Sequence, residues 1–205
     1  MQDKNIKTKP VPSKLFMYQK LYQDLEEMKK KYKNFSITEF ACGASKILGS
    51  IKPTYYQGID LKRKLILESK HKNKNENYNF FIGNMINFKS KKRTSLGLCI
   101  QTFGINLDFN DKILLKCLNN LNRHISKNGS IIFNLSNELY QKNKKMIDSF
   151  CYENYFDVHN VNYGLFNQRY FYQLTRILVI IEKVFSLKNK FKKYVYIQCI
   201  NKKSH

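Results

Sequence analysis

Short apolar runs alternate with amphipathic stretches through most of the chain. Runs rich in β-branched and aromatic residues predict strands at about residues 36–40, 55–60, 78–82, 96–101 and 130–135. Capping signals and helical spacing predict helices at about 13–33, 45–50, 62–70 and 111–125. Because strands that alternate with helices through short turns pair in parallel, this order predicts an α/β domain with helices on both faces of one sheet.

The segment at 13–33 has the features of one long helix. Ser13 can cap its first turn, and the lysines at 29–31 complement the dipole of its last turn. Apolar and aromatic side chains recur every three or four positions and predict one buried stripe, made of Leu15, Tyr18, Tyr22, Leu25, Met28 and Tyr32. The polar, proline-bearing residues 1–12 predict a loose leader.

The remaining segments complete a single domain. Polar residues predict a loop at 71–77 and a turn at 127–129. Further along, the pattern predicts a helix at 141–151, a strand that begins at 154–158 and a last strand at 194–200. An aromatic piece at 163–185 lies between those two strands. A chain of 205 residues is long enough for one domain, over 1–205, and a second would be cramped.

The most informative motif follows the first predicted strand. Glu39 ends that strand, the small residues of the stretch 41–45 form a tight turn, and Asp60 ends the second strand 21 positions after Glu39. Small residues let the backbone approach a ligand, and a carboxylate at the end of the second strand can accept from both ribose hydroxyls. The layout predicts a nucleotide-binding βαβ unit, although the dinucleotide motif Gly-x-Gly-x-x-Gly is absent.

The stretch 39–45 resembles motif I of the class I S-adenosylmethionine (SAM) dependent methyltransferases, which often reads Glu-Leu-Ala-Cys-Gly-Thr-Gly. The segment 123–133 is similar to that family's lysine-proline-glycine-glycine approach to strand five. The resemblance covers about 37–137. It implies a seven-stranded, mostly parallel, doubly wound Rossmann-like sheet whose last strand is antiparallel between strands five and six. It also implies a cofactor-binding core at 36–137, an N-terminal helix beside the site and a substrate-side part at 138–205.

The resemblance implies roles for the motif residues. Glu39 would contact the methionine ammonium of SAM, often through water, and Asp60 would hold the ribose. Ala41, Cys42 and Gly43 would form the turn that the cofactor approaches closely, and Leu61 would cover one adenine face. Each acid also has an ordinary structural alternative. Glu39 could be a helix N-cap partner, and Asp60 could be a solvated acid at a strand end. Ser45 replaces a glycine of the family, and we expect it to keep ordinary dihedral angles.

Residues after strands three and four complete the implied site. Asn84 stands where the family often has an aspartate, and its amide can pair with adenine. Met85 would wall the adenine pocket or simply pack in the core, and Gln101 would lie at the floor of the methyl-transfer site. The family's Asn-Pro-Pro-Tyr tetrapeptide is absent at 101–104. This absence counts against amino-group methylation of nucleic-acid bases.

No general base can be identified from the sequence. His159, Tyr163 and Arg169 are the candidates for contact with an acceptor, and an aromatic cap or an oligomer interface explains the last two equally well. His124 is expected to be an ordinary surface or core residue. Methyl transfer from a sulfonium can proceed largely by proximity and alignment, so a missing base is tolerable for an amine acceptor and a greater obstacle for a hydroxyl acceptor.

The formal charge of +22 suggests a nucleic-acid partner. The 37 basic residues are nearly all lysine, however, whereas sites that recognise phosphate or guanine favour arginine. The abundant residue types have A/T-rich codons, so genome composition also explains the excess. A solvated basic surface is the simpler interpretation.

The cysteines and the hydropathy pattern narrow the setting. The five cysteines are scattered without metal-ligand spacing, which predicts buried, reduced thiols and no metal site. No apolar run reaches the roughly 18 residues that span a bilayer, and the first residues have no apolar signal core. We therefore expect a cytoplasmic protein. The apolar face of Ile177, Leu178, Ile181 and Val184 could be core or a homodimer seam.

These observations favour a SAM-dependent methyltransferase that acts on a small or medium acceptor, such as a sugar or another intermediate of cell-surface or secondary biosynthesis. An RNA methyltransferase is the first alternative, since it would use the basic charge. A catalytically silent, methyltransferase-like binding protein is the second, because Ser45, Asn84 and the missing base depart from an active site.

Overall fold

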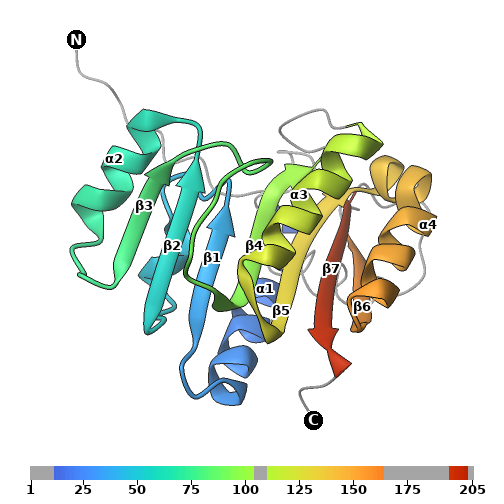
Figure 1. Ribbon diagram of the computed structural model, residues 1–205, viewed down its shortest axis with the longest axis horizontal. Coiled ribbons are helices and arrows are strands. Elements are labelled where there is room, and N and C mark those ends of the chain that lie inside the picture. Colours follow the sequence, from blue (N-terminus) through green and yellow to red (C-terminus); the bar gives the residue numbers. More distant parts are fainter. Residues whose placement is uncertain (1–11, 104–109, 164–193, 203–205) are drawn as a thin grey trace.

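The computed structural model describes residues 12–103, 110–163 and 194–202, and these residues form a seven-stranded sheet in the order β3-β2-β1-β4-β5-β7-β6 (Figure 1). The strands are β1 Ser36–Phe40, β2 Tyr55–Asp60, β3 Tyr78–Ile82, β4 Thr94–Phe103, β5 Ile125–Ser136, β6 Phe156–Tyr163 and β7 Tyr194–Asn201. Strands β1 to β5 pair in parallel, and β7 is antiparallel to both β5 and β6. The predicted fold class and the antiparallel last strand are confirmed.

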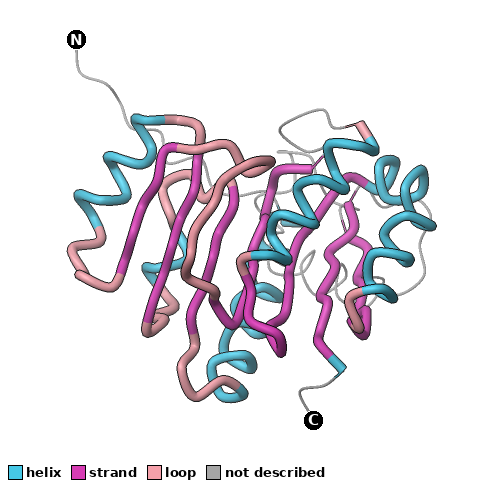
Figure 2. The backbone as a smooth tube through the Cα atoms, viewed as in Figure 1, coloured by secondary structure: helices cyan, strands magenta, loops and turns pink. Residues whose placement is uncertain are grey.

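Helices cover both faces of this sheet (Figure 2). They are α1 Pro12–Lys31, the short 3-10 helix η1 Lys46–Gly49, α2 Arg63–Lys72, α3 Asp111–Arg123 and α4 Asn137–Glu153. Two residues of β1 pack on opposite faces of the sheet and show that the core has two parts. Ile37 packs in the core shared with α1, η1 and α2, and Phe40 packs in the core shared with α3 and α4. Burial on both faces explains why the central strands are apolar runs.

Helix α1 is rotated relative to the stripe predicted for it. Its most buried apolar side chains are Phe16, Met17, Leu21, Leu25 and Met28, whereas the predicted Leu15, Tyr18, Tyr22 and Tyr32 are only partly buried. A buried carboxylate helps to set this orientation. Asp24 is 1% exposed, accepts a 2.6 Å hydrogen bond from Tyr196 of β7 and pairs with Lys20. The orientation of α1 that buries Asp24 leaves the predicted tyrosines only partly buried.

Other boundaries differ where polar residues obscure an element. The residues predicted as a turn at 127–129 lie within β5, which begins at Ile125 and changes register against β4 before Ser130. Helix α4 begins at Asn137, before the predicted start at 141. Ser136 caps it by accepting from the Leu139 amide at 3.2 Å. Helix α2 extends to Lys72, into the predicted loop. The aromatic insert from 164 onward lies outside the described residues.

His124 is a core residue, in agreement with the ordinary role expected for it. It is 3% exposed, its Nδ1 lies 2.8 Å from the Asn120 carbonyl oxygen, and its Nε2 accepts from the Ser90 amide at 3.1 Å. None of the helices in the described ranges is both long and apolar enough to cross a membrane.

Candidate functional site

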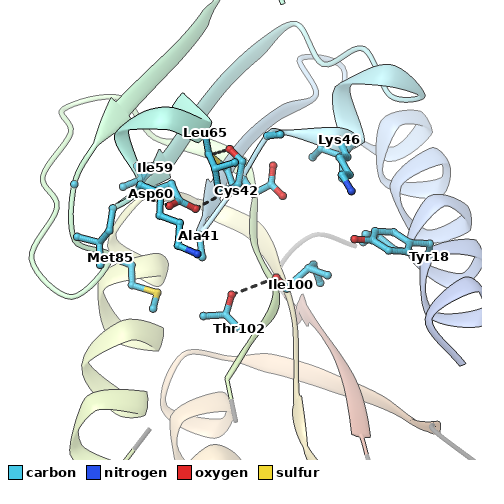
Figure 3. Close-up of a pocket in the computed structure, with 18 residues that line it drawn as sticks. Tyr18, Ala41, Cys42, Lys46, Ile59, Asp60, Leu65, Met85, Ile100 and Thr102 are labelled. Atoms are coloured by element: carbon cyan, nitrogen blue, oxygen red, sulfur yellow. Dashed lines mark hydrogen bonds between the residues drawn. The ribbon is translucent and has the colours of Figure 1, made fainter. Parts of the chain in front are cut away.

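A cavity of about 350 Å³ opens at the carboxyl ends of β1, β2 and β4, between the sheet edge and α1 (Figure 3). Ligands of open α/β sheets bind at this edge. The cavity is lined by Tyr18, Leu21, Glu39, Ala41, Cys42, Gly43, Ala44, Lys46, Ile47, Ile59, Asp60, Leu61, Lys62, Leu65, Gly83, Met85, Ile100 and Thr102. Its size falls within the range of small-molecule sites, about 300–1,000 Å³.

The turn after β1 has an unusual backbone. Ala41, Gly43 and Ser45 all have left-handed conformations, with φ of 53°, 56° and 49°. The expectation that Ser45 would keep ordinary dihedral angles is therefore wrong. A side chain in this region costs about 1 to 2 kcal/mol relative to the right-handed form. The Cys42 amide donates to the Ile59 carbonyl at 3.1 Å, which ties the turn to β2 and helps it to hold these angles.

Asp60 joins the turn to the start of α2. Its Oδ2 accepts from the Gly43 amide at 2.9 Å, and its Oδ1 accepts from the Lys62 amide at 2.8 Å. A carboxylate oxygen can accept more than one hydrogen bond, so both oxygens keep capacity for a ligand. The side chain is half-buried on the cavity wall, as Figure 3 shows. Its carboxylate therefore positions the turn and also presents acceptors to the cavity.

Glu39 is a buried acid at the same edge. It is 6% exposed, lines the cavity and accepts a short hydrogen bond from the hydroxyl of Tyr56, which is itself fully buried. Burial raises the pKa of Glu39 to about 8, the Tyr56 hydrogen bond opposes this shift, and the charge of Asp60 adds to it. In the described part of the chain, Glu39 has no ion pair.

Most of the predicted cofactor residues meet around this cavity. Leu61 lies on its rim with 61% of its surface exposed, and Met85 lies on its wall. Asn84 is absent from the lining, and its Oδ1 accepts from the Ile86 amide at 2.9 Å, as asparagine often does after a strand. Its adenine contact stays a prediction. Gln101 lies in β4 between two residues of the lining, Ile100 and Thr102.

Sequence reasoning did not connect three side chains with this site. Tyr18 reaches from α1 toward the cavity, Lys46 stands at its rim and Thr102 lies at its floor (Figure 3). Burial raises the pKa of Tyr18 above its ordinary value, and the charge of Glu39 raises it further. In the sequence only its hydroxyl distinguishes Tyr18 from the aliphatic members of its stripe, and Tyr22 and Tyr32 share that feature.

Two of the candidates for contact with an acceptor, His159 and Tyr163, lie in the described residues, and neither lines the cavity. His159 is exposed on β6, opposite Gln198 of β7. Tyr163 ends β6 at the same side of the sheet, but it is 1% exposed and its hydroxyl accepts from Asn134. Arg169 lies outside the described residues. The acceptor roles of all three stay predictions.

The thiols are arranged as the sequence predicts. All five cysteines are buried and none forms a disulfide. Burial raises the pKa of Cys42 well above the ordinary value of a thiol, and the charge of Glu39 acts in the same direction. Within 12–103, 110–163 and 194–202, no group of three or more His, Cys, Asp or Glu could hold a metal ion.

No protein-family model matches the sequence, and no curated protein matches it. Solved structures do match. The N-methyltransferase NodS from Bradyrhizobium japonicum WM9, in complex with S-adenosyl-l-homocysteine, has a TM-score of 0.63 and 10% identity, covering 98% of this chain and 93% of that one. The magnesium protoporphyrin IX methyltransferase from Synechocystis PCC 6803, with bound SAM, has a TM-score of 0.60 and 9% identity, covering 91% of this chain and 80% of that one.

An amino pentose methyltransferase from Micromonospora echinaspora, also bound to SAM, is similar only in part. Its TM-score is 0.48 at 12% identity, and the match spans 56% of this chain and about half, 49%, of that one. Identities this low support a fold and nothing finer. Together with the strand order and the antiparallel β7, the two full-length matches establish that this chain has the fold of the class I SAM-dependent methyltransferases.

Proposed function

We propose that this protein is a SAM-dependent methyltransferase that binds its cofactor in the cavity at the carboxyl edge of the sheet. The observation that carries the proposal is the pair of acids around one tight turn. Glu39 and Asp60 come from neighbouring strands, flank the left-handed turn and line one cavity of about 350 Å³. The full-length structural neighbours, which hold SAM or its demethylated product, support the same reading.

Each part of the cofactor has a matching group in the cavity. The Asp60 carboxylate would accept from the ribose hydroxyls, and Glu39 would face the methionine ammonium. Leu61 and Met85 would contact the adenine, because both are apolar side chains that line the cavity together with Asp60. The turn after β1 lines the cavity, so its backbone would lie against the rest of the ligand.

The acceptor would be a small or medium molecule that enters beside Tyr18 and Thr102, where the cavity lies between α1 and β4. Transfer would require the acceptor atom to lie in line with the methyl group, so the contribution of the protein is alignment and exclusion of water. An amine acceptor would need no base. Sugars and other biosynthetic intermediates belong to the size class that such a cavity can admit.

Calorimetry tests the cofactor part directly. We expect wild-type protein to bind SAM and S-adenosylhomocysteine, and Asp60→Ala to lose this binding. Asp157→Ala is the matched control, because Asp157 is an exposed acid on β6 whose only recorded partner in the described chain is Lys202. Absence of binding to wild type, or equal loss in both variants, would rule out the assignment of the cavity as the cofactor site.

A further inference from the structure

The carboxylate of Glu39 belongs to a buried hydrogen-bonded group of three side chains. The Tyr56 hydroxyl donates to Glu39 Oε2 and lies 3.0 Å from Ser45 Oγ. All three are buried, with exposures of 6%, 0% and 2% for Glu39, Tyr56 and Ser45. They come from β1, β2 and the turn between β1 and η1, so one hydroxyl connects three of the segments that line the cavity.

Gly58 makes this arrangement sterically feasible. Tyr56 and Gly58 lie on the same face of β2, two residues apart, and Gly58 is the register partner of Glu39 on β1. A Cβ at Gly58 would lie 2.8 Å from Tyr56 Cε1 and Oη, and 2.9 Å from Cys42 Sγ. The phenol ring therefore lies over the glycine, along its own strand, and carries its hydroxyl to the sheet edge.

The group is held in defined protonation states. Burial raises the pKa of Tyr56 well above 10, and the charge of Glu39 adds to this effect, so Tyr56 stays a hydrogen-bond donor at neutral pH. With its own pKa raised to about 8, Glu39 is mostly protonated at pH 7. The titratable and charged groups around Glu39 are Tyr18 of α1, Cys42 of the turn, Lys46 of η1, Tyr56 and Asp60 of β2, and Cys99 of β4.

We propose that Tyr56 and Ser45 are positioning residues that hold the Glu39 carboxyl toward the cavity, and that binding of the ammonium group of an amino acid there releases the Glu39 proton. The inference rests on the proposed function, because it takes the ammonium of the amino-acid part of SAM or S-adenosylhomocysteine as the cation. The inference also explains why a serine occupies position 45. A glycine at 45 would fit the left-handed backbone more easily, but it would lack the hydroxyl that lies beside Tyr56.

The proton balance follows from the charges. In the ligand-free protein at pH 7, Glu39 is largely the neutral acid. When an ammonium group arrives, it favours the carboxylate, so the acid proton passes to the buffer and the ligand keeps its own proton. A pKa of about 8 predicts release of about 0.9 proton per bound ligand at pH 7, provided that the ammonium lowers this pKa well below 7.

Two ligands separate positioning from general structure. S-adenosylhomocysteine carries the ammonium, whereas 5′-methylthioadenosine keeps the adenosine thioether and lacks the amino acid. Because a hydrogen bond to an ionised group is stronger than a neutral one, we expect Tyr56→Phe to weaken S-adenosylhomocysteine about tenfold and 5′-methylthioadenosine hardly at all. Tyr78→Phe is the matched control, since Tyr78 packs against Tyr56 but donates to the Pro53 carbonyl, and it should change neither affinity.

Calorimetry at pH 7 in buffers of different ionisation enthalpy measures the proton. Release of about 0.9 proton is expected with S-adenosylhomocysteine and wild type, and none with 5′-methylthioadenosine or with Glu39→Gln. Equal weakening of both ligands in Tyr56→Phe, or proton release that persists in Glu39→Gln, would overturn the inference. Failure of wild type to bind either ligand would instead refute the proposed function, so the two failures are distinguishable.

Discussion

Replacing Glu39 by glutamine should stabilise the ligand-free protein, and more strongly as the pH rises. Glutamine keeps the size of the side chain and an oxygen that can accept from Tyr56, but it cannot ionise. The ordinary pKa of a glutamate is 4.5, and burial raises the folded-state value to about 8. Between these two pH values the wild-type acid is neutral when folded and charged when unfolded.

The sign of the effect follows from this difference. A group whose pKa is raised by folding stabilises the folded state fully below its unfolded pKa, and this contribution is lost as the pH rises to the folded value. With one proton released on unfolding, the free energy of unfolding of wild type falls by about 1.4 kcal/mol per pH unit relative to Glu39→Gln. From pH 5.5 to 7.5 the relative gain of the glutamine variant is about 2.5 kcal/mol, because the folded-state acid begins to ionise near pH 7.5.

Urea unfolding at pH 5.5, 6.5 and 7.5 without ligand would measure this gain, because all other titrating groups are common to the two proteins and cancel in the difference. Glu76→Gln is the control, since Glu76 is exposed and should give a difference that changes little with pH. A Glu39→Gln difference that is constant between pH 5.5 and 7.5 would refute the reasoning, and with it the neutral state of Glu39 in the free protein.

Two further predictions concern the free energy of unfolding. Gly58→Ala should lower the free energy of unfolding by about 1 to 3 kcal/mol, because its Cβ would collide with Tyr56. Gly43→Ala should lower the free energy of unfolding by only about 1 kcal/mol, which is the cost of its left-handed φ. The nearest atom to a Cβ at Gly43 is 4.0 Å away, so no collision adds to this cost. Equal losses for Gly58→Ala and Gly43→Ala in urea unfolding would contradict this prediction. Tyr196→Phe should lower the free energy of unfolding by about 2 kcal/mol, because it leaves the buried Asp24 with fewer hydrogen-bond donors. Tyr152→Phe is the control, since Tyr152 is exposed and its replacement should change thermal unfolding little. Comparable shifts in the two variants would count against the Asp24 contact.

The course of the chain through the sheet was predictable because it rests on local pattern. Strands β1, β2 and β3 occupy the predicted residues, since buried strands appear as short apolar runs whatever their neighbours are. The positions of Glu39 and Asp60 follow for the same reason. Parallel strands bring their carboxyl ends to one edge, so acids that end two such strands face one site.

The sequence by itself therefore determined the α/β order and the pair of acids. Only the tertiary structure decided what surrounds them, because those contacts join residues that are distant in the chain or depend on backbone angles. The left-handed Ser45 is held by the tie between the turn and β2, and the rotation of α1 depends on the Asp24 contact with a strand 172 residues away. The sequence has a tyrosine, Tyr56, two residues before Gly58, but only the pairing of β1 with β2 places its hydroxyl on Glu39.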